Sequence, residues 1–537
     1  MRLVARDKSI CLEGAPEAIR PLVRQWFGVA RRGEDARRIE IEPKRVLALS
    51  QHYRDRVSVS PGVQAWLTRG LETVDQRISK RCRSYRGGYQ ARAILRMVRD
   101  KSHGCWIDAG GGKTVIALEV ASLLGPTLLV VPPSIWRQAY VGTRRKPGDL
   151  SHYPGLVVAD ATDSHGSEAR KRALRTRADL YAVSPYTVGG LVDELRDLPV
   201  AAIVWDESSL LRNPATTMAQ VARDVLANKT AYKFPLSANP CPADVGELWS
   251  QVEWMRPGHL GSWKDFASTY GQRTRWGYEF RDVDLAVQAL DRVRSFSTML
   301  PQERFWRDRP SLAMRTVSVA LGPKERRAYD AMAEDMRLRL DGTDEWGDAD
   351  LVAVERELGK RTKLRELTAG FVYDSRQQPR WTGERSKLAA IAGLLAAEPA
   401  EQWLIWGQFE AEMELIAGAL ERRGISAGYY TGDNRESRKL LRRFTERRVQ
   451  VLVANTASLG HGVRLENAAR AIYASLPDSP DQFYQSLRRI YRPPQQRDCV
   501  AYLLAAAHTI DTDQLTALRR RMAWRQRFEQ ALYSQAA

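Results

Sequence analysis

The sequence predicts an α/β protein built from two tandem lobes, each a parallel sheet with helices on both faces, together with a helical insertion and a small N-terminal appendage. Three observations lead to this fold class. Apolar runs such as "TLLVVP" and "AAIVWDE" alternate with helix-like segments, which favours parallel strands covered on both faces. The same alternation returns after residue 384, in "WLIWGQ" and "VQVLVAN". A chain of 537 residues is also too long for one hydrophobic core.

Changes of pattern along the chain divide it into five predicted segments. Residues 1–80 mix short strand-like and helix-like pieces, which predicts a small accessory domain. Residues 81–255 form the first lobe, and residues 381–515 form the second. Residues 256–380 are polar, arginine-rich and mostly helical, which predicts a helical insertion or linker. The chain ends in residues 516–537, a basic amphipathic helix.

Composition and charge indicate what kind of molecule this protein binds. Lys and Arg number 83 against 64 Asp and Glu, a net charge of +19. This excess favours a polyanion such as nucleic acid, although a generally basic proteome or a need for solubility would give the same balance. No apolar run approaches the ~20 residues that cross a membrane, and "MRLVARDKSICLEG" lacks the apolar core of a secretory signal. The five scattered cysteines show no zinc spacing, so we expect reduced thiols and a cytoplasmic protein.

A glycine-rich turn follows the first strand of the first lobe, in "CWIDAGGGKTVIALEVA". Glycine lets successive backbone N–H groups face inward, and it removes side chains that would block a phosphate. The helix that begins directly after the turn adds the positive end of its dipole. We therefore expect Lys113 to reach the β- and γ-phosphates of a nucleotide and the Thr114 hydroxyl to bind Mg²⁺. The three glycines are Gly110, Gly111 and Gly112.

The turn departs from the strict pattern G-x-x-x-x-G-K-[ST], which needs glycine where this chain has Ile107. A glycine-rich turn that binds no ligand could have the same flanks. A second acidic element supports the nucleotide interpretation, because hydrolysis needs a carboxylate for the metal and a base beside the γ-phosphate. "AAIVWDESS" supplies both at the end of an apolar strand. Asp206 is the candidate Mg²⁺ residue, and Glu207 is the candidate base that orients or deprotonates water.

The motifs of the first lobe resemble those of superfamily 2 helicases, specifically the Swi/Snf-like double-stranded DNA translocases. Motifs I, II and III correspond in order to "DAGGGKT", "WDESSLLRNP" and "LSANPCPADVGELWSQVEWMRPG". "GGYQARAIL" places Gln90 where the family has an adenine-reading glutamine. "TLLVVPPSIWRQ" matches motif Ia, which lies along DNA in the family, and it makes Pro132 a candidate nucleic-acid contact.

The second lobe extends the resemblance, which covers roughly residues 85–515. "LIWGQFEAEMELIAGALERRGISAGYYTGDNRESRKLLRRF" is similar to motif IV and the helix after it, and the stretch from "TASLGHGVRLEN" to "AAAHTID" is similar to motifs V and VI. The family pattern Q-A-x-x-R-x-x-R-x-x-Q begins here at Gln485. It implies that Arg489 and Arg492 are arginine fingers, on one expected helix face. The candidate nucleic-acid contacts in motif V are Thr456 and Arg464.

The chain departs from the family pattern at several motif positions. Motif II has Ser209 where histidine is usual, and motif III has Ala238-Asn239 in place of Gly-Thr, which puts its coupling role in question. Arg464 stands where the family commonly has asparagine. No bromodomain-like, chromodomain-like or zinc element remains in the sequence. The chain therefore resembles the motors of bacteria and bacteriophages that lack such accessory elements.

The resemblance implies tandem RecA-like lobes that hold ATP and Mg²⁺ between them and that move on nucleic acid, most favourably double-stranded DNA. The first lobe would supply the phosphate cradle and the base, and the second would supply the arginines. Nucleic acid that closes the lobes would then switch on hydrolysis. Three alternatives stay open: an RNA helicase, an ATP-binding scaffold that grips nucleic acid without turnover, and the motor subunit of a larger complex.

Two segments outside the motifs allow more than one interpretation. The aromatic side chains in and beside the insertion could clamp DNA, or they could form a core of its own. They are Trp263, Trp276, Trp306, Trp346 and Trp381. The C-terminal stretch "RRRMAWRQRF" could bind phosphate, brace the first lobe or present a solvated charged face.

Overall fold

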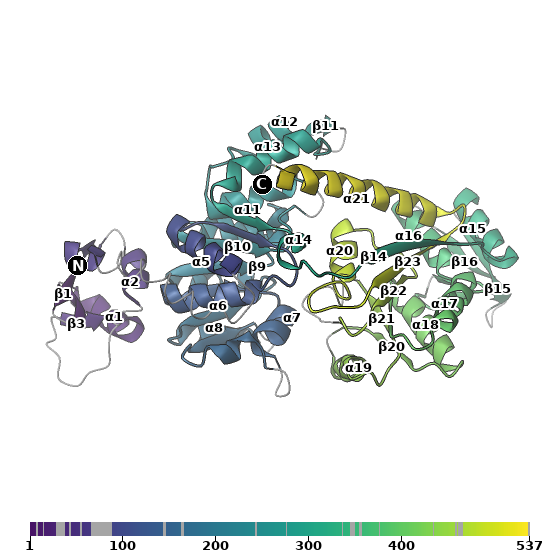
Figure 1. The fold of residues 1–537 in the computed structure, drawn as a ribbon, viewed down its shortest axis with the longest axis horizontal. Helices are drawn as coiled ribbons and strands as arrows, with labels where there is room; N and C mark the ends of the chain where they lie inside the picture. Colours follow the sequence, from purple (N-terminus) through teal and green to yellow (C-terminus); the bar gives the residue numbers. More distant parts are fainter. Residues whose placement is uncertain are drawn as a thin grey trace. The chain divides into compact units, whose positions relative to one another are not determined.

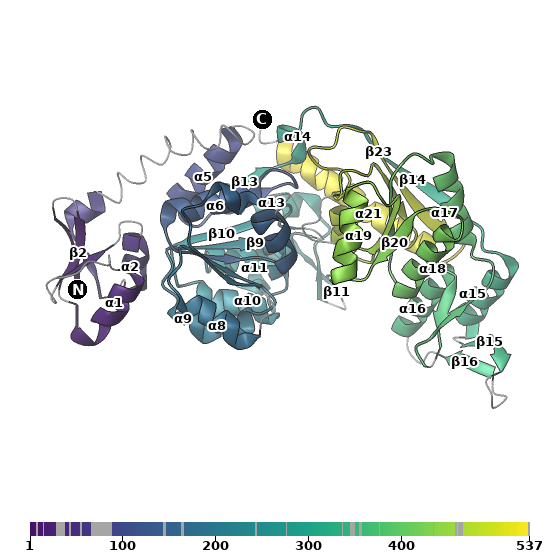
Figure 2. The same cartoon turned by 90° about the horizontal axis from the view of Figure 1, so that it is seen from below.

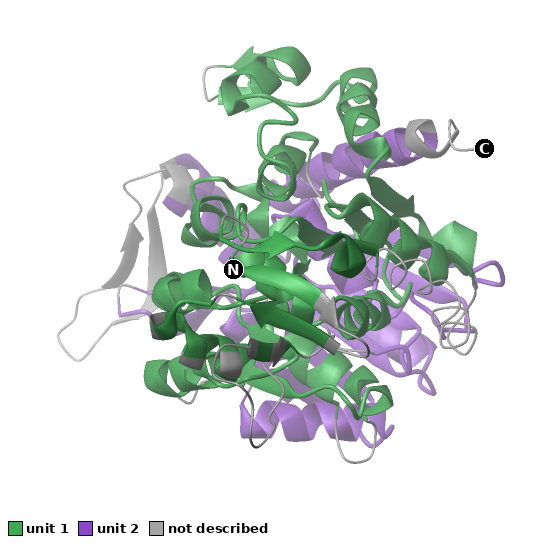
Figure 3. Ribbon diagram, turned by 90° about the vertical axis from the view of Figure 1, so that its left-hand side faces the viewer, with its two compact units in different colours: residues 1–305, 531–537 green, residues 306–530 purple. Residues whose placement is uncertain are grey.

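The computed structural model describes residues 1–6, 9–13, 15–27, 38–41, 45–53, 56–65, 88–142, 147–162, 166–241, 244–274, 277–335, 337–343, 349–353, 357–374, 376–432, 434–456, 459 and 465–534 (Figure 1). The chain divides into two compact units (Figure 3). The first comprises residues 1–305 with residues 531–537, and the second comprises residues 306–530. Each unit contains one large parallel sheet, which confirms the predicted pair of RecA-like lobes.

A small mixed sheet begins the first unit. Its strand order is β3-β2-β1-β4, with β1 antiparallel to β2 and parallel to β4. Leu3 and Leu12 of the sheet pack with Val23 and Leu49 of two helices, and all four side chains are buried. The elements are β1 (Arg2–Arg6), β2 (Ser9–Glu13), η1 (Glu17–Ile19), α1 (Arg20–Trp26), β3 (Arg38–Ile41), α2 (Val46–His52) and β4 (Ser58–Val59).

A buried ion pair joins this small domain to the lobe that follows it. Nη2 of Arg45 lies 2.9 Å from Oδ1 of Asp179 and donates to the carbonyl oxygen of Ala178 at 3.1 Å. The Arg45 and Asp179 side chains are each 3% exposed. Ala201 of the lobe also packs into the core of the small domain. Such a pair is costly to break, because the charge that remains would be buried alone.

A seven-stranded sheet, in the order β13-β5-β10-β9-β6-β8-β7, forms the centre of the first lobe, and all its neighbouring strands are parallel. The apolar runs predicted as strands are buried throughout, as expected of strands covered on both faces. Figure 2 shows α5 and α6 over one face and α8, α9 and α10 over the other.

The strands of this sheet are β5 (Gly104–Ile107), β6 (Thr127–Val130), β7 (Val158–Ala161), β8 (Leu180–Val183), β9 (Ala202–Asp206), β10 (Tyr232–Ser237) and β13 (Ser297–Leu300). The larger helices of the lobe are α5 (Gly88–Asp100), α6 (Lys113–Leu124), α8 (Ser167–Arg175), α9 (Val192–Asp197), α10 (Thr217–Val221), α11 (Gly246–Met255), α12 (Trp263–Tyr270) and α13 (Val283–Arg294). A hairpin of β11 (Gln272–Thr274) and β12 (Gly277–Glu279) follows α12, and α14 (Gln302–Phe305) ends the unit.

The segment expected to be a mostly helical insertion, residues 256–380, supplies a strand to each large sheet. β13 pairs with β5 at one edge of the first sheet, and β14 (Leu312–Val319) pairs with β23 (Cys499–Ala506) at one edge of the second. The division between the units falls inside this segment, after Phe305. The pattern of apolar residues did not indicate β13 and β14, because both are edge strands with half-exposed residues whose partners are distant in sequence.

A six-stranded parallel sheet, in the order β14-β23-β22-β19-β21-β20, forms the centre of the second unit. The other strands are β19 (Trp403–Gly407), β20 (Ala427–Tyr430), β21 (Val451–Asn455) and β22 (Arg470–Tyr473). The helices are α15 (Pro323–Asp335), α16 (Glu357–Thr368), α17 (Ser386–Ala397), α18 (Glu410–Glu421), α19 (Arg435–Thr445), α20 (Pro480–Leu487) and α21 (Ile510–Ser534). Two hairpins complete it: β15 (Arg337–Thr343) with β16 (Ala349–Ala353), and β17 (Phe371–Tyr373) with β18 (Pro379–Trp381).

The described tryptophans in and beside residues 256–380 pack mainly within their own units. The ring centroid of Trp263 lies 5.7 Å from that of Trp249, and the centroid of Trp306 lies 5.1 Å from that of Tyr491. Trp381 is 42% exposed. The other two, Trp276 and Trp346, lie outside the described residues.

The basic C-terminal segment is part of one long helix, α21, which begins before the expected boundary at residue 516. Nζ of Lys387 lies 2.7 Å from Oδ2 of Asp511 in the first turn, and both side chains are buried. Further along, the guanidinium of Arg525 lies 3.4 Å from the ring centroid of Tyr484. Both contacts attach α21 to its own unit. Among the described residues, no helix is long and apolar enough to span a bilayer.

Candidate active site

The glycine turn lies between the end of β5 and the start of α6, as predicted. Gly110 and Gly112 adopt left-handed backbone angles, with φ of 83° and 80°. A Cβ atom on Gly111 would lie 2.3 Å from Cγ2 of Ile107, and one on Gly112 would lie 2.1 Å from Nε2 of Gln90. The turn therefore requires glycine for its backbone angles and for its close packing.

Three side chains hold the turn in place. Nε2 of Gln90 and the Tyr89 hydroxyl both donate to the carbonyl oxygen of Gly111, each at 3.1 Å. Nε2 of Gln302 donates to the carbonyl oxygen of Ala109 at 3.4 Å. Gln90 is buried, and its Oε1 has no hydrogen-bond partner in the described part of the chain. The predicted adenine-reading glutamine therefore supports the turn with one end of its amide and keeps an acceptor at the other.

Lys113 and Thr114 open α6, and both are half-buried. Nζ of Lys113 donates to the carbonyl oxygen of Ile107 at 2.8 Å, so the ammonium lies against the turn. Its charge also acts on the carboxylate of Asp206, which ends β9. Because β5, β10 and β9 are parallel neighbours, their carboxyl ends meet at one edge of the sheet. The structure thus brings the predicted cradle and the predicted acidic pair to the same edge.

Asp206 is 3% exposed and has two hydrogen-bond donors. The Tyr140 hydroxyl donates to Oδ2 at 2.9 Å, and the backbone N–H of Glu207 donates to Oδ1 at 3.1 Å. Burial raises the pKa of Asp206 to about 6, while the Lys113 charge opposes this shift and the Glu207 charge adds to it. At neutral pH the carboxyl is therefore mostly ionised and available to a cation.

Glu207 has a backbone φ of 63°, in the left-handed region that non-glycine residues seldom adopt. Its Oε1 accepts hydrogen bonds from the Ser209 hydroxyl at 2.7 Å and from the Ser237 hydroxyl at 3.4 Å. Ser209 stands at the motif II position where histidine is usual, and Ser237 is the second residue of motif III. Motifs II and III are therefore in contact through the candidate base, while Asn239 accepts from the N–H of Cys241 within its own turn at 3.0 Å.

Tyr140 is a site residue that sequence reasoning missed. It lies in a π-helical segment (Trp136–Val141) that follows the short helix α7 (Pro133–Ile135) of motif Ia. The Trp136 ring stacks on it with centroids 5.4 Å apart, and the indole N–H donates to Oδ2 of Asp160 at 2.6 Å. No pattern distinguishes this tyrosine from the other buried aromatics of the lobe. Its role becomes visible only through its contact with Asp206.

The predicted placement of Arg489 and Arg492 on one helix face is wrong. Helix α20 ends at Leu487, and both arginines follow it in a turn. The N–H of Arg489 bonds to the carbonyl oxygen of Ser486 at 3.1 Å. Pro493-Pro494 also prevents a helix from continuing past this turn, because proline has no N–H and disfavours helical angles in the residue before it. Arg489 is buried and Arg492 is half-buried in this turn.

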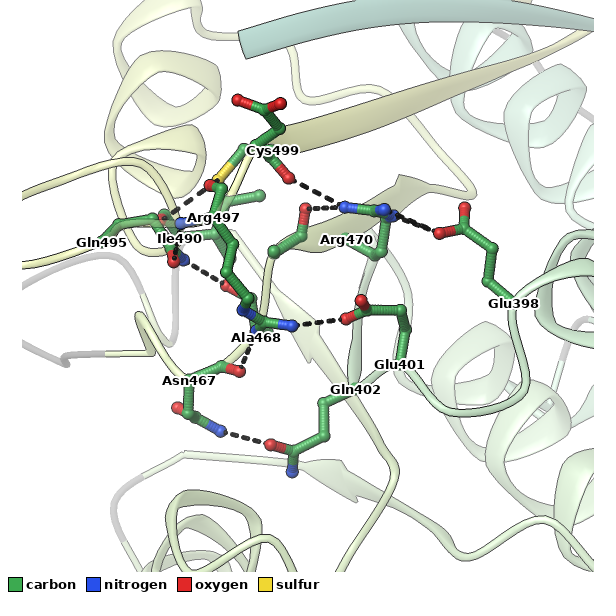
Figure 4. A network of polar contacts seen from close by, with 12 residues as sticks. Glu398, Glu401, Gln402, Asn467, Ala468, Arg470, Ile490, Gln495, Arg497 and Cys499 are labelled. Carbon is green, nitrogen blue, oxygen red and sulfur yellow. Dashed lines mark hydrogen bonds and ion pairs between the residues drawn. The ribbon is translucent and has the colours of Figure 1, made fainter. Parts of the chain in front are cut away.

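A polar network contacts Ile490, which lies between the two arginines in the sequence (Figure 4). Nε2 of Gln495 donates to the carbonyl oxygens of Glu466 and Ala468, each at 2.9 Å, and to that of Ile490 at 3.2 Å. Nearby, Nη1 of Arg497 lies 2.7 Å from Oε2 of Glu401. A buried amide that bonds three carbonyl groups fixes the path of the chain. The final glutamine of motif VI therefore fixes the backbone at Ile490, between the two arginines.

The remaining predicted residues take up varied environments. Nε2 of Gln485 donates to Oδ2 of Asp481 within α20 at 3.0 Å. Thr456 is buried, and its hydroxyl accepts from Nε2 of Gln408 at 3.3 Å. Pro132 is also buried. Arg464, predicted as a nucleic-acid contact, lies outside the described residues.

The residues of the first unit fit ATP with Mg²⁺. Gly110 and Gly112 give the turn its left-handed backbone angles, and helix α6 begins directly after it, so its N-terminus is at the turn. Lys113 supplies a cation for phosphate, Thr114 and Asp206 supply the oxygen ligands that Mg²⁺ prefers, and Gln90 keeps a free acceptor for an amino group.

Comparisons with known proteins agree with the motifs. The helicase conserved C-terminal domain family matches residues 386–494. An uncharacterized ATP-dependent helicase, YqhH, of Bacillus subtilis is 22% identical over 333 residues, covering 58% of this chain and 57% of that protein. The SWI/SNF-related matrix-associated actin-dependent regulator of chromatin subfamily A-like protein 1 of Xenopus tropicalis is 22% identical over 422 residues, covering 75% of this chain and 40% of that protein.

Among solved structures, the Sulfolobus solfataricus SWI2/SNF2 ATPase core in complex with dsDNA aligns with a TM-score of 0.37 and 20% identity, covering 81% of this chain and 91% of that one. The chain spans about half the length of the curated relatives it matches.

Proposed function

We propose, from the premise that the chain is a superfamily 2 helicase of the Swi/Snf-like group, that it hydrolyses ATP and uses the energy to move on nucleic acid, most favourably duplex DNA. One observation carries this proposal. The carboxyl ends of three neighbouring strands gather a glycine cradle with Lys113, a buried carboxylate at Asp206 and a carboxylate at Glu207 held by two hydroxyls. In phosphoryl transfer to water, such groups hold the phosphates and the metal ion and orient the attacking water.

The first unit binds the nucleotide and activates water. The turn N–H groups, the start of α6 and Lys113 hold the phosphates. Thr114 and Asp206 hold Mg²⁺, which neutralises charge on the β- and γ-oxygens when bound. Oε2 of Glu207 takes the proton of the attacking water, since Ser209 and Ser237 both act on Oε1. The acceptor Oε1 of Gln90 suits the amino group of adenine.

The second unit completes the reaction through Arg489 and Arg492. Their guanidinium groups would stabilise the charge that develops on the γ-phosphate, with Gln485 as a further nucleotide contact. Arg489 and Arg492 belong to the second unit, while Lys113 and Glu207 belong to the first. Nucleic acid that binds both units would couple hydrolysis to movement.

The nucleic acid is expected to be held by its phosphates, because a motor must work on every sequence. The net charge of +19 supports this. Pro132 and Thr456 are buried, so their neighbouring backbone is the better candidate for contact than their side chains; Arg464 remains a proposed phosphate contact. The described cysteines form no disulfide, in keeping with a cytoplasmic location.

A phosphate-release assay with a panel of ligands tests the function. We expect duplex DNA to stimulate hydrolysis more than single-stranded DNA or RNA, and we expect Lys113→Ala to release no phosphate above background. Stronger stimulation by single-stranded RNA would favour an RNA helicase instead. Equal release by the wild type and Lys113→Ala would eliminate hydrolysis at this site and leave the scaffold alternative.

Tyr140→Phe is expected to weaken the response to Mg²⁺. The change removes only the hydroxyl that orients Asp206, and loss of such an outer partner typically costs about 10–100-fold in metal affinity or activity. The Mg²⁺ concentration for half-maximal hydrolysis should rise accordingly. Tyr153→Phe is the matched control, since its hydroxyl donates to the buried carboxylate of Glu119 at 3.0 Å in the same lobe. The same Mg²⁺ midpoint in both variants would show that Tyr140 is only a packing residue.

A further inference from the structure

Helix α19 of the second unit, labelled in Figures 1 and 2, follows motif IV and carries a strongly basic face whose residues are not among the candidate contacts named above. Residues 435–448 contain seven cationic side chains and two acidic ones, a net charge of +5. All seven cations are exposed. The cations are Arg435, Arg438, Lys439, Arg442, Arg443, Arg447 and Arg448.

The helix has two distinct sides. Phe444 is buried in the core of the second unit, and Leu440 and Leu441 pack against the same core. The exposed residues of α19 are all charged except Thr445. Three ion pairs, at 3.5 to 3.8 Å, involve Glu436 and Glu446. Among the described residues, Arg435, Arg443 and Arg447 form no ion pair, and the two acidic side chains leave residues 435–448 with a net charge of +5.

The end of α19 shows that an arginine is kept at a position where glycine is favoured. Arg447 has a φ of 60°, and its N–H bonds to the carbonyl oxygen of Phe444 at 3.0 Å. The N–H of Arg448 bonds to the carbonyl oxygen of Arg443 at 2.8 Å. These two bonds define the helix end that usually places glycine in the left-handed position.

The preceding helix in the sequence, α18, ends in the same way, but with glycine. Gly424 has a φ of 77°, its N–H bonds to the carbonyl oxygen of Glu421, and the N–H of Ile425 bonds to that of Leu420. The same fold therefore uses glycine at one helix end and arginine at the other. The arginine at 447 costs backbone strain and makes no ion pair among the described residues, so its guanidinium is available to a ligand.

We propose that the basic face of α19 binds the phosphate backbone of nucleic acid, as a contact additional to the candidates Pro132, Thr456 and Arg464. This inference rests on the proposed function. Six of the seven cations are arginines, whose planar guanidinium pairs with phosphate through two parallel hydrogen bonds. A docked protein would need apolar or aromatic anchors at the centre of its interface, and the described face offers none. At about 1.5 Å per residue, the face is roughly 20 Å long, or about six base pairs of duplex.

A salt titration of duplex binding by the full-length protein tests the proposal. We expect Arg443→Gln with Arg447→Gln to lower the slope of log affinity against log salt concentration by about 1.8, because each phosphate contact contributes about 0.9. The ratio of affinities at 50 and 200 mM KCl then shrinks by about tenfold. The probe is a 30-base-pair DNA of random sequence.

The matched control is Arg422→Gln with Arg423→Gln. These arginines are also exposed and also end a helix of the same unit. Residues of α18 pack into a core on the opposite side of the sheet from that of α19, so the control removes the same charge from another face. We expect the control to keep the wild-type slope. Equal slopes in all three proteins, or an equal loss in both pairs, would overturn the proposal.

Arg447→Gly separates a structural role from a binding role. The substitution relieves the left-handed strain, so we expect Tm to rise by about 1–3 °C while the salt slope falls by about 0.9. A higher Tm with an unchanged slope would make α19 a solvated face and overturn the inference. If the slope is unchanged but nucleic acid still stimulates hydrolysis by the wild-type protein, the proposed function is retained. Wild-type protein without any duplex binding would defeat both.

Discussion

Arg492→Ala is expected to lower kcat of nucleic-acid-stimulated ATP hydrolysis by about 10³–10⁵-fold, the range that arginine fingers contribute in phosphoryl transfer. Arg489→Lys should have a similar effect, since it keeps the charge but loses the two-pronged guanidinium. Both variants should still bind ATP and nucleic acid, because those contacts come mainly from other residues. The measurement is steady-state phosphate release at saturating duplex, together with equilibrium nucleotide binding.

Two controls make this result interpretable. Arg422→Ala removes an exposed arginine from the same unit and should keep the wild-type rate. Thermal unfolding should be compared as well, because Arg489 is buried and its loss can destabilise the turn. A normally folded Arg492→Ala variant with a rate within tenfold of the wild type would rule out this arginine as a catalytic residue.

Glu207→Gln is expected to lower kcat by about 10²–10⁴-fold, the usual contribution of a general base. The side chain keeps its shape and still accepts from Ser209, so nucleotide binding and stability should change little. Single-turnover hydrolysis with bound nucleotide measures the chemical step directly. Ser209→Ala should give a smaller loss, because it frees the carboxylate without removing it.

Glu168→Gln is the control for Glu207→Gln. It makes the same chemical change at a side chain that is 80% exposed on α8. It should hydrolyse ATP at the wild-type rate. If Glu207→Gln also kept that rate, another group would have to accept the proton of water, and the mechanism proposed for the first unit would be wrong.

The strands of both lobes and the glycine turn could be predicted because they depend on local sequence. Buried parallel strands are continuous apolar runs, and the structure confirms that Gly110 and Gly112 adopt angles few other residues reach. The order of motifs also placed Lys113, Asp206 and Glu207 in one lobe. They lie at one edge of the sheet because their strands are parallel, so that the carboxyl ends of the strands meet there.

Other features depend on contacts that no local pattern contains. β13 and β14 form because edges of two sheets accept them, and their half-exposed residues give a weak signal. The bond from Tyr140 to Asp206 joins residues on separate elements, so neither position shows it alone. Pro493-Pro494 limits how far the helix can extend, but it does not place the end of α20 at Leu487, before both arginines.

The pairing of Arg45 with Asp179 has a practical consequence for deletion experiments. A protein shortened to begin after residue 65 would lose the guanidinium that faces the Asp179 carboxylate, and it would bare the apolar surface around Ala201. Such a truncation would aggregate or melt early, so its inactivity would say nothing about what the accessory domain recognises. Point changes on the outer surface of that domain are the informative experiment.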